Sequence, residues 1–215
     1  MNTKNTSTTK KYYDHVSVAS RTKQVSYFVQ QHDKCEMFME ILKNLFDKQL
    51  LVLVKSKKTA DILMDFLNKK KFKSLAIHGN HRVSQMEEAQ KLFNSKELNI
   101  LITTDGILKR LSLENIQAVI SYDLPLEASE YFKRLILVDE IGEAISFIDP
   151  DDEVVLAKIE FMMKSQMDEV EIENFQHTKS PSKEKKDKTK KPRHKKVEQR
   201  AKKKAEIKSK WLASE

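Results

Sequence analysis

Short apolar runs in this chain alternate with segments whose apolar residues recur every three to four positions. Residues 50–54, Ile100–Thr103 and Ala118–Ser121 are apolar at nearly every position, which is typical of strands buried on both faces of a parallel sheet. We expect further strands at residues 24–29, Ser74–Ile77 and 144–148, the first of them at an edge of the sheet.

Helical spacing of apolar residues separates these strands. Ser56 is expected to cap the second helix, and Asp149 the last, with Pro150 at its first position. The helices are expected at residues 33–46, 60–67, 84–93, 126–134 and 150–163. Because strands and helices alternate with short connections, the sequence predicts an α/β fold with a single doubly wound parallel sheet.

Charge divides the chain into two parts. Residues 176–215 hold 16 of the 40 Lys and Arg residues and 5 of the 32 Asp and Glu residues, which leaves 24 and 27 for residues 1–175. We therefore expect a flexible N-terminal segment at 1–23, a folded domain at 24–166, and an acidic linker with a Lys-rich tail at 167–215. Cations on a flexible segment neutralise phosphates of nucleic acid, which indicates RNA as a partner. The tail candidates for RNA contacts are Lys185, Lys186, Lys190, Lys191, Arg193, Lys195, Lys196, Arg200, Lys202, Lys203 and Lys204.

Several classes of protein are disfavoured by the composition. Cys35 is the one cysteine, so no intrachain disulfide can form. Neither a signal peptide nor a membrane span is found among the apolar stretches, and a cytoplasmic location without a membrane partner is expected. His78 and His81 lie three positions apart without a third ligand near them in sequence, so no metal site is expected.

A set of short motifs follows the strands in a fixed order. They are Ser56-Lys57, His78-Gly79, Phe93, Thr104-Asp105 and Tyr122-Asp123-Leu124-Pro125. In this order and spacing, residues 24–166 resemble the second RecA-like domain of DEAD-box RNA helicases. The resemblance implies a RecA-like sheet that contacts the RNA backbone beyond its strand ends. The candidate RNA contacts in the domain are Ser56, Lys57, His78, Gly79, Arg82, Thr104, Lys109 and Arg110.

The chain departs from that family at its nucleotide-side positions. Where the family has two activating arginines, this sequence has Leu137 and Glu140, and the family's ribose-contacting acid is replaced by Ser112. No G-x-x-x-x-G-K-[ST] loop and no DEAD box occur in the sequence. Asp105 and Arg134 are the residual nucleotide-side candidates. We therefore expect no catalytic residues and no cofactor, with ATP bound only together with a partner that carries a first RecA-like domain.

These features predict an RNA-binding, non-catalytic helicase-like protein of RNA metabolism or ribonucleoprotein assembly, with ribosomal RNA among the candidate partners. One alternative is a helicase half that completes an ATP-dependent RNA helicase in trans. Another is a protein-interaction module. Two residue-level alternatives also stay open, because Thr104 and Asp105 could equally cap a helix, and Asp123 is expected to be structural.

Overall fold

The structure is a computed structural model that describes residues 14–138, 142–173 and 175–178. The helices in these ranges are α1 (His15–Arg21), α2 (Lys34–Leu42), α3 (Lys57–Lys69), α4 (Val83–Asn94), α5 (Asp105–Leu108), α6 (Ala128–Leu135) and α7 (Glu153–Met163). The strands are β1 (Lys23–Phe28), β2 (Leu50–Leu53), β3 (Ser74–Ile77), β4 (Ile100–Thr103), β5 (Ala118–Ser121), β6 (Glu143–Ile148) and β7 (Asp168–Glu169).

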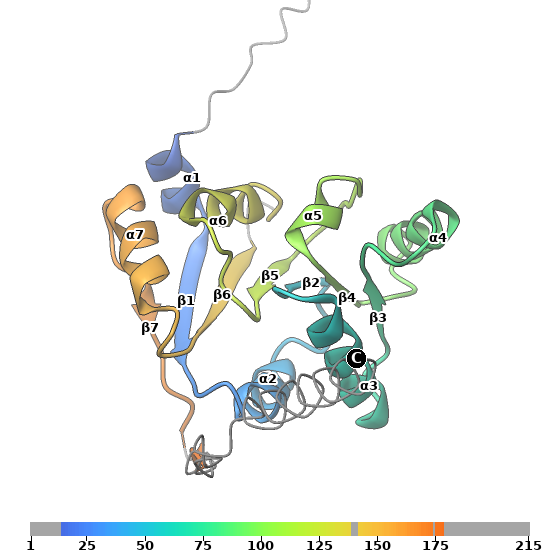
Figure 1. The fold of residues 1–215 in the computed structure, drawn as a ribbon, viewed down its shortest axis with the longest axis horizontal. Coiled ribbons are helices and arrows are strands. Elements are labelled where there is room, and N and C mark those ends of the chain that lie inside the picture. The colour runs from blue at the N-terminus through green and yellow to red at the C-terminus, as the bar shows by residue number, and fades with distance from the viewer. Residues whose placement is uncertain (1–13, 139–141, 174, 179–215) are drawn as a thin grey trace, which may run out of the picture. The chain divides into compact units, whose positions relative to one another are not determined.

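The strands form one parallel sheet in the order β3-β4-β2-β5-β6-β1-β7 (Figure 1). Leu50 at the start of β2 lies opposite Ile100 on one side and Ala118 on the other. The predicted α/β fold with a parallel sheet is therefore confirmed. β4 and β5 occupy the residues that the apolar runs predicted.

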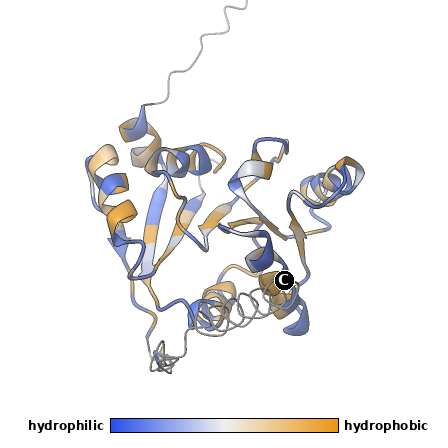
Figure 2. Ribbon diagram, in the orientation of Figure 1, coloured by the Kyte–Doolittle hydropathy of each residue, from blue (hydrophilic) through white to orange (hydrophobic). Residues whose placement is uncertain are grey.

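Successive residues of the central strands point to opposite faces of the sheet. Leu50 and Val52 belong to the core beneath α2 and α3, whereas Leu51 and Leu53 pack on the face covered by α4 and α5. Figure 2 shows hydrophobic residues along these strands, which is why the runs are apolar at every position rather than alternating.

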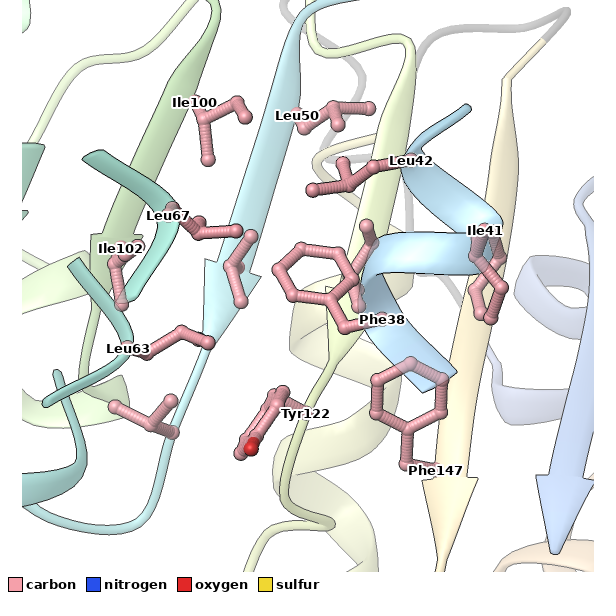
Figure 3. Close-up of a cluster of buried hydrophobic side chains, with 14 of the residues drawn as sticks. Phe38, Ile41, Leu42, Leu50, Leu63, Leu67, Ile100, Ile102, Tyr122 and Phe147 are labelled. Atoms are coloured by element: carbon pink, nitrogen blue, oxygen red, sulfur yellow. The ribbon is translucent and has the colours of Figure 1, made fainter. Parts of the chain in front are cut away.

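Aromatic rings fill the first of these cores near the ends of β5 and β6. The Phe38 ring of α2 lies 6.0 Å from the rings of both Tyr122 and Phe147, and these two rings lie 5.7 Å apart (Figure 3). All three contacts are edge-on, a favoured geometry for aromatic pairs. The cluster fixes α2 over the two strands, and thereby the position of Lys34 at the start of α2.

The predicted flexible segment at 1–23 contains an element that was not predicted, helix α1. Asp14 caps it by accepting a hydrogen bond from the Ser17 N–H at 2.9 Å. Val18 and Ala19 are buried against α6 and α7, and the His15 ring stacks on Phe132 at 4.3 Å. The short helix is held by packing against its neighbours rather than by its own apolar pattern.

Two other predictions need correction. β1 is not an edge strand, because the two residues of β7 pair with Val25 and Ser26 and take the edge. The last helix begins at Glu153, not at Pro150. Asp149 instead closes a turn in which its carboxylate accepts a hydrogen bond from the Asp151 N–H. Across the described residues, none of the helices has the length and apolar character that crossing a membrane requires.

Candidate functional site

The parallel sheet places the polar residues that follow its strands along one edge, which we call the carboxyl edge. Lys55 follows β2, His78 follows β3, Thr104 follows β4, and Asp123 follows β5. In open parallel α/β sheets, ligands bind at this edge. The structure therefore brings the predicted domain candidates, which are far apart in sequence, to one side of the fold.

The first group at this edge is the turn after β3 together with the start of α3. The Lys57 Nζ donates a hydrogen bond to the Asn80 Oδ1 at 2.7 Å. A Cβ atom added to Gly79 would meet the end of the Lys57 side chain at 3.4 Å, so the glycine allows this close approach. The Lys57 ammonium thus lies against an exposed turn of backbone, an arrangement suited to holding a phosphate.

Two other candidates in this group already have partners within the protein. Ser56 caps α3, because its hydroxyl oxygen accepts a hydrogen bond from the Thr59 N–H at 3.0 Å. The capping role that the sequence predicted for Ser56 is therefore confirmed. His78 is buried, and its Nε2 lies 2.9 Å from the Asp61 carboxylate. Both residues hold the site in shape, and Lys57 is the group that faces solvent.

The remaining cations of the edge come from α4 and α5. Arg82 precedes α4, where its backbone N–H donates to the Gln85 side-chain oxygen at 2.8 Å, and its side chain is exposed. Lys109 lies 3.4 Å from Glu130 of α6, and Arg110 is exposed. Arg82, Arg110 and Lys57 therefore present charge to solvent, while Lys109 is partly neutralised.

The structure bears on one of the two readings that the sequence left open for Thr104 and Asp105, the helix cap. Thr104 is at the N-cap position of α5, but its side chain makes no capping hydrogen bond. The Asp105 carboxylate instead receives two hydrogen bonds from Arg134, from Nε at 2.8 Å and from Nη2 at 2.7 Å. The pair joins α5 to α6 across the carboxyl edge.

Arg134 is buried, and nearly all of its N–H donors are used in hydrogen bonds within the protein. Besides the two bonds to Asp105, its Nη1 donates to the Ser121 Oγ and to the Asp123 backbone oxygen, both at 2.8 Å. Four of its five N–H donors are therefore used inside the protein, and its side chain is 1% exposed. Arg134 acts as a structural bridge and has little capacity left for a ligand.

A buried ionic network next to this bridge was missed by the sequence reasoning. The Lys34 Nζ is fully buried and lies 3.1 Å from the Asp123 carboxylate, 3.0 Å from Asp149 and 3.9 Å from Asp152. Lys55 completes the network through a 2.6 Å contact with Asp152. The only signal in the sequence was an aspartate after each of two apolar strands, which does not reveal the lysine from α2.

The network shifts the ionisation of its members in the directions expected of ion pairs. Burial tends to raise the pKa of Asp149, but its hydrogen bond and charge interaction with Lys34 outweigh burial and lower that pKa below its ordinary value. For Lys55 burial acts to lower the pKa, and Asp152 overrides it and raises the pKa. Asp123 also accepts from the Lys55 backbone N–H at 2.9 Å, so the predicted structural role of Asp123 holds.

Among the described residues, no three His, Cys, Asp or Glu side chains converge in a way that could bind a metal ion. The tail candidates from Lys185 to Lys204 lie outside the described residues. Glu140, one of the positions where the family has an arginine, also lies outside them.

Sheet order, connections and site together define a RecA-like α/β domain. Comparison with known proteins identifies it further, because residues 33–136 match the helicase conserved C-terminal domain. This match confirms the resemblance that the motifs predicted. The described fold is thus similar to the second RecA-like domain of DEAD-box helicases.

Two RNA helicases are similar to this chain in sequence. The chain is 35% identical over 133 residues to the mouse ATP-dependent RNA helicase DDX4, covering 60% of this chain and 19% of that protein. It is 34% identical over 141 residues to the Drosophila melanogaster ATP-dependent RNA helicase vasa, covering 64% and 21%. The chain therefore spans about a fifth of the length of these relatives.

Solved structures show the same domain. A DEAD-box protein from Methanococcus jannaschii superposes with a TM-score of 0.67 at 29% identity, covering 72% of this chain and 43% of that one. Dbp5 from Saccharomyces cerevisiae, solved with RNA and ADP BeF3, gives a TM-score of 0.65 at 22% identity, covering 70% and 41%. The second likeness is evidence for the fold alone.

The residues at the nucleotide side do not fit the phosphates of a nucleoside triphosphate. Arg134 is buried in its bridge, and Leu137, at the next arginine position of the family, is a partly buried apolar side chain packed against the core under α4 and α5. A leucine offers no charge or hydrogen bond to a phosphoryl group.

Proposed function

We propose that this protein binds RNA through its phosphate backbone and does not itself hydrolyse ATP. The observation that carries the proposal is that some cations of the carboxyl edge are exposed to solvent, while others are bonded within the protein. Lys57, Arg82 and Arg110 are exposed there, whereas Arg134 and its neighbours are consumed by internal bonds. Exposed cations hold phosphates without reading bases, and the Lys-rich tail supplies most of the affinity.

RNA affinity of the full chain and of a chain ending at Thr178 tests the binding part of the proposal. Between 50 and 200 mM salt the affinity of the full chain should fall by orders of magnitude, because each phosphate contact releases counterions. The shortened chain should bind more weakly and with a shallower salt slope. The absence of RNA binding by the full chain at 50 mM salt would contradict the proposal.

An ATPase assay on the purified chain, with and without RNA, tests the catalytic part. We expect no turnover above background, because Leu137 and Glu140 stand where the family has its activating arginines. A substitution that removes RNA contacts of the carboxyl edge, such as Lys57→Ala combined with Arg82→Ala, should leave this background unchanged. Turnover that depends on RNA and is lost in the double variant would overturn the non-catalytic assignment.

A second candidate function is completion of an RNA helicase in trans. It is favoured by one observation, the match of residues 33–136 to the helicase conserved C-terminal domain, a domain that the resemblance pairs with a first RecA-like domain. Stimulation of the ATPase of a separate first RecA-like domain would support it. Lys57→Ala is the appropriate variant for that assay, because substitution of buried Arg134 would disturb the fold itself.

A further inference from the structure

A group of exposed lysines lies at the opposite edge of the sheet, where β3 and β4 begin. Lys69 is the last residue of α3, and two lysines follow it directly. A fourth precedes β3, and the fifth lies between α4 and β4. We call these residues the amino-edge lysine cluster: Lys69, Lys70, Lys71, Lys73 and Lys96.

The cluster joins two turns that lie on either side of β3. Helices α3 and α4 cover opposite faces of this strand (Figure 1). The Lys73 Nζ donates a hydrogen bond to the Glu97 backbone oxygen at 3.0 Å, which links the turn after α3 to the turn after α4. Five cations are thereby gathered where β3 and β4, which pair in parallel, begin side by side.

The charge of the cluster is poorly compensated. In the described part of the chain, Lys69, Lys71 and Lys96 make neither an ion pair nor a side-chain hydrogen bond. Glu97 is the one acid in the two turns, and its carboxylate accepts a hydrogen bond from the Ser95 hydroxyl at 3.0 Å. Like charges held close together repel, and a polyanion would relieve that repulsion.

We propose that the amino-edge lysine cluster is a second contact site for the RNA backbone, separate from the carboxyl edge. The inference rests on the proposed function, that the chain binds RNA. The two edges lie at opposite ends of α3, which spans about 18 Å at 1.5 Å per residue. Asp61 and Asp65 are exposed on α3 between them and would repel phosphates. RNA therefore meets the two edges as separate contacts rather than along the helix.

The chemistry of the cluster favours a phosphate backbone over an acidic protein. Protein interfaces are anchored by buried aromatic and apolar side chains, and the aromatic residues here are already committed. Phe66 and Phe72 are half-buried and pack against the core beneath α2 and α3, and the Lys70 ammonium lies 5.6 Å above the Phe66 ring. What remains exposed is a set of point charges, which suits phosphates.

Backbone conformation offers a way to remove charge without harming the fold. Lys71 and Lys96 follow the last turns of α3 and α4 with φ angles of 68° and 64°. Glycine adopts this left-handed conformation more easily than lysine, so Lys71→Gly and Lys96→Gly relieve strain while they remove charge. Lys164, at the end of α7, has a φ of 57° and lies outside the cluster, so Lys164→Gly is the matched control.

The test uses the full chain and a fluorescent single-stranded 20-nucleotide oligouridine, titrated at 50 to 200 mM salt. For the Lys71→Gly/Lys96→Gly variant we expect affinity to fall by up to about 25-fold at 0.1 M salt. The slope of log affinity against log salt should become shallower by about 1.4, since each single-strand phosphate contact contributes about 0.7. Lys164→Gly should keep the wild-type affinity and slope.

A second measurement is independent of the tail. Acetylation of lysine amines, mapped by mass spectrometry, should show Lys71 and Lys96 protected when the oligouridine is bound, and Lys164 unprotected. The second site is overturned if the double variant keeps the wild-type affinity and salt slope and if RNA does not protect Lys71 and Lys96 of the wild-type chain. The proposed function would remain intact in that case. Polyglutamate serves as a probe for an acidic protein partner. If the double variant loses binding to polyglutamate but keeps wild-type RNA binding, the cluster is a site for an acidic protein and not for RNA. No RNA binding by the wild-type chain would overturn both proposals.

Discussion

Arg134 shows how the surroundings of one residue decide its role. The sequence placed it at a nucleotide-side position, and a guanidinium there could in principle have stabilised a phosphoryl group. In the structure it bridges Asp105 of α5, Ser121 of β5 and the backbone of Asp123. The orientation of its side chain depends on three elements that the sequence alone does not place.

Substitution of Arg134 by methionine should therefore test stability rather than catalysis. It leaves the Asp105 carboxylate without its bidentate partner and the buried Ser121 hydroxyl without a donor, which should cost about 3–5 kcal/mol of unfolding free energy. Urea denaturation measures the loss. Lys133→Met is the control, because Lys133 is an exposed neighbour that pairs only with Glu130. Equal stability of the two variants would refute the bridge.

Lys34 makes a second prediction at this scale. Lys34→Met leaves Asp123 and Asp149 charged and buried without their partner, so we expect a stability loss of about 3–5 kcal/mol at pH 7. The pKa of Asp149 is lowered in the folded protein. Its contribution is therefore present above the unfolded-state pKa near 3.9 and disappears as the pH falls through the lower folded-state pKa.

The difference between wild type and Lys34→Met should consequently shrink as the pH is lowered below about 4, where protonation removes the unpaired charges. Urea denaturation at pH 7 and at pH 3.5 measures it. Lys43→Met serves as a control, because Lys43 pairs with Glu40 on the exposed side of α2. A deficit that stays constant over this pH range would mean that packing, and not charge, explains the loss.

Whether an element could be predicted from the sequence depends on whether its stabilising contacts produce a local sequence pattern or come from residues far away in the chain. β4 and β5 were predicted to the residue because burial on both faces imposes a continuous apolar run, a local signal. Helix α1 was missed because Val18 and Ala19 become buried only against α6 and α7. The Lys34 network was missed for the same reason, since it pairs α2 with Asp149, 115 residues later.

Element boundaries lead to a prediction about fragments. A fragment of residues 24–166 lacks α1, β7 and the segment that follows β7. That segment packs Ile172 and Phe175 on the core and fixes Thr178 to Asp33 by two hydrogen bonds. We expect a fragment of residues 14–178 to be more stable, because burying even one residue such as Val18 contributes about 1.5–3 kcal/mol.

Urea unfolding of the two fragments measures this difference. Val18→Ser should lower the stability of the longer fragment and so reproduce part of the difference between the two fragments. Val16→Ser should have little effect, because Val16 is exposed. If the two fragments unfold at the same urea concentration, α1 and the segment after β7 contribute nothing to the stability of the domain.

At the scale of the molecule, the location of the charged side chains matters more than the net charge. Residues 1–175 hold slightly more acidic than basic residues, yet exposed cations gather at both edges of the sheet. Acidic side chains of the carboxyl edge are paired in the buried network, and two further acids are exposed on the middle of α3. A domain with little net charge can therefore carry two local sites for a polyanion, which net charge alone would not reveal.

The pairing of β1 has a kinetic consequence. Lys23 lies opposite Glu143, so β1 reaches its neighbour β6 only after 120 further residues have been made. At 5–20 residues per second, a ribosome takes about 6–24 s over that interval. We expect β2, β4 and β5 to associate first and β1 to join last, so that amides of β1 gain protection late in pulse-labelled hydrogen exchange. Strand β1 would then join the sheet after the central strands that follow it in sequence, and the nascent protein would expose the unpaired edge of β1 until β6 has been made.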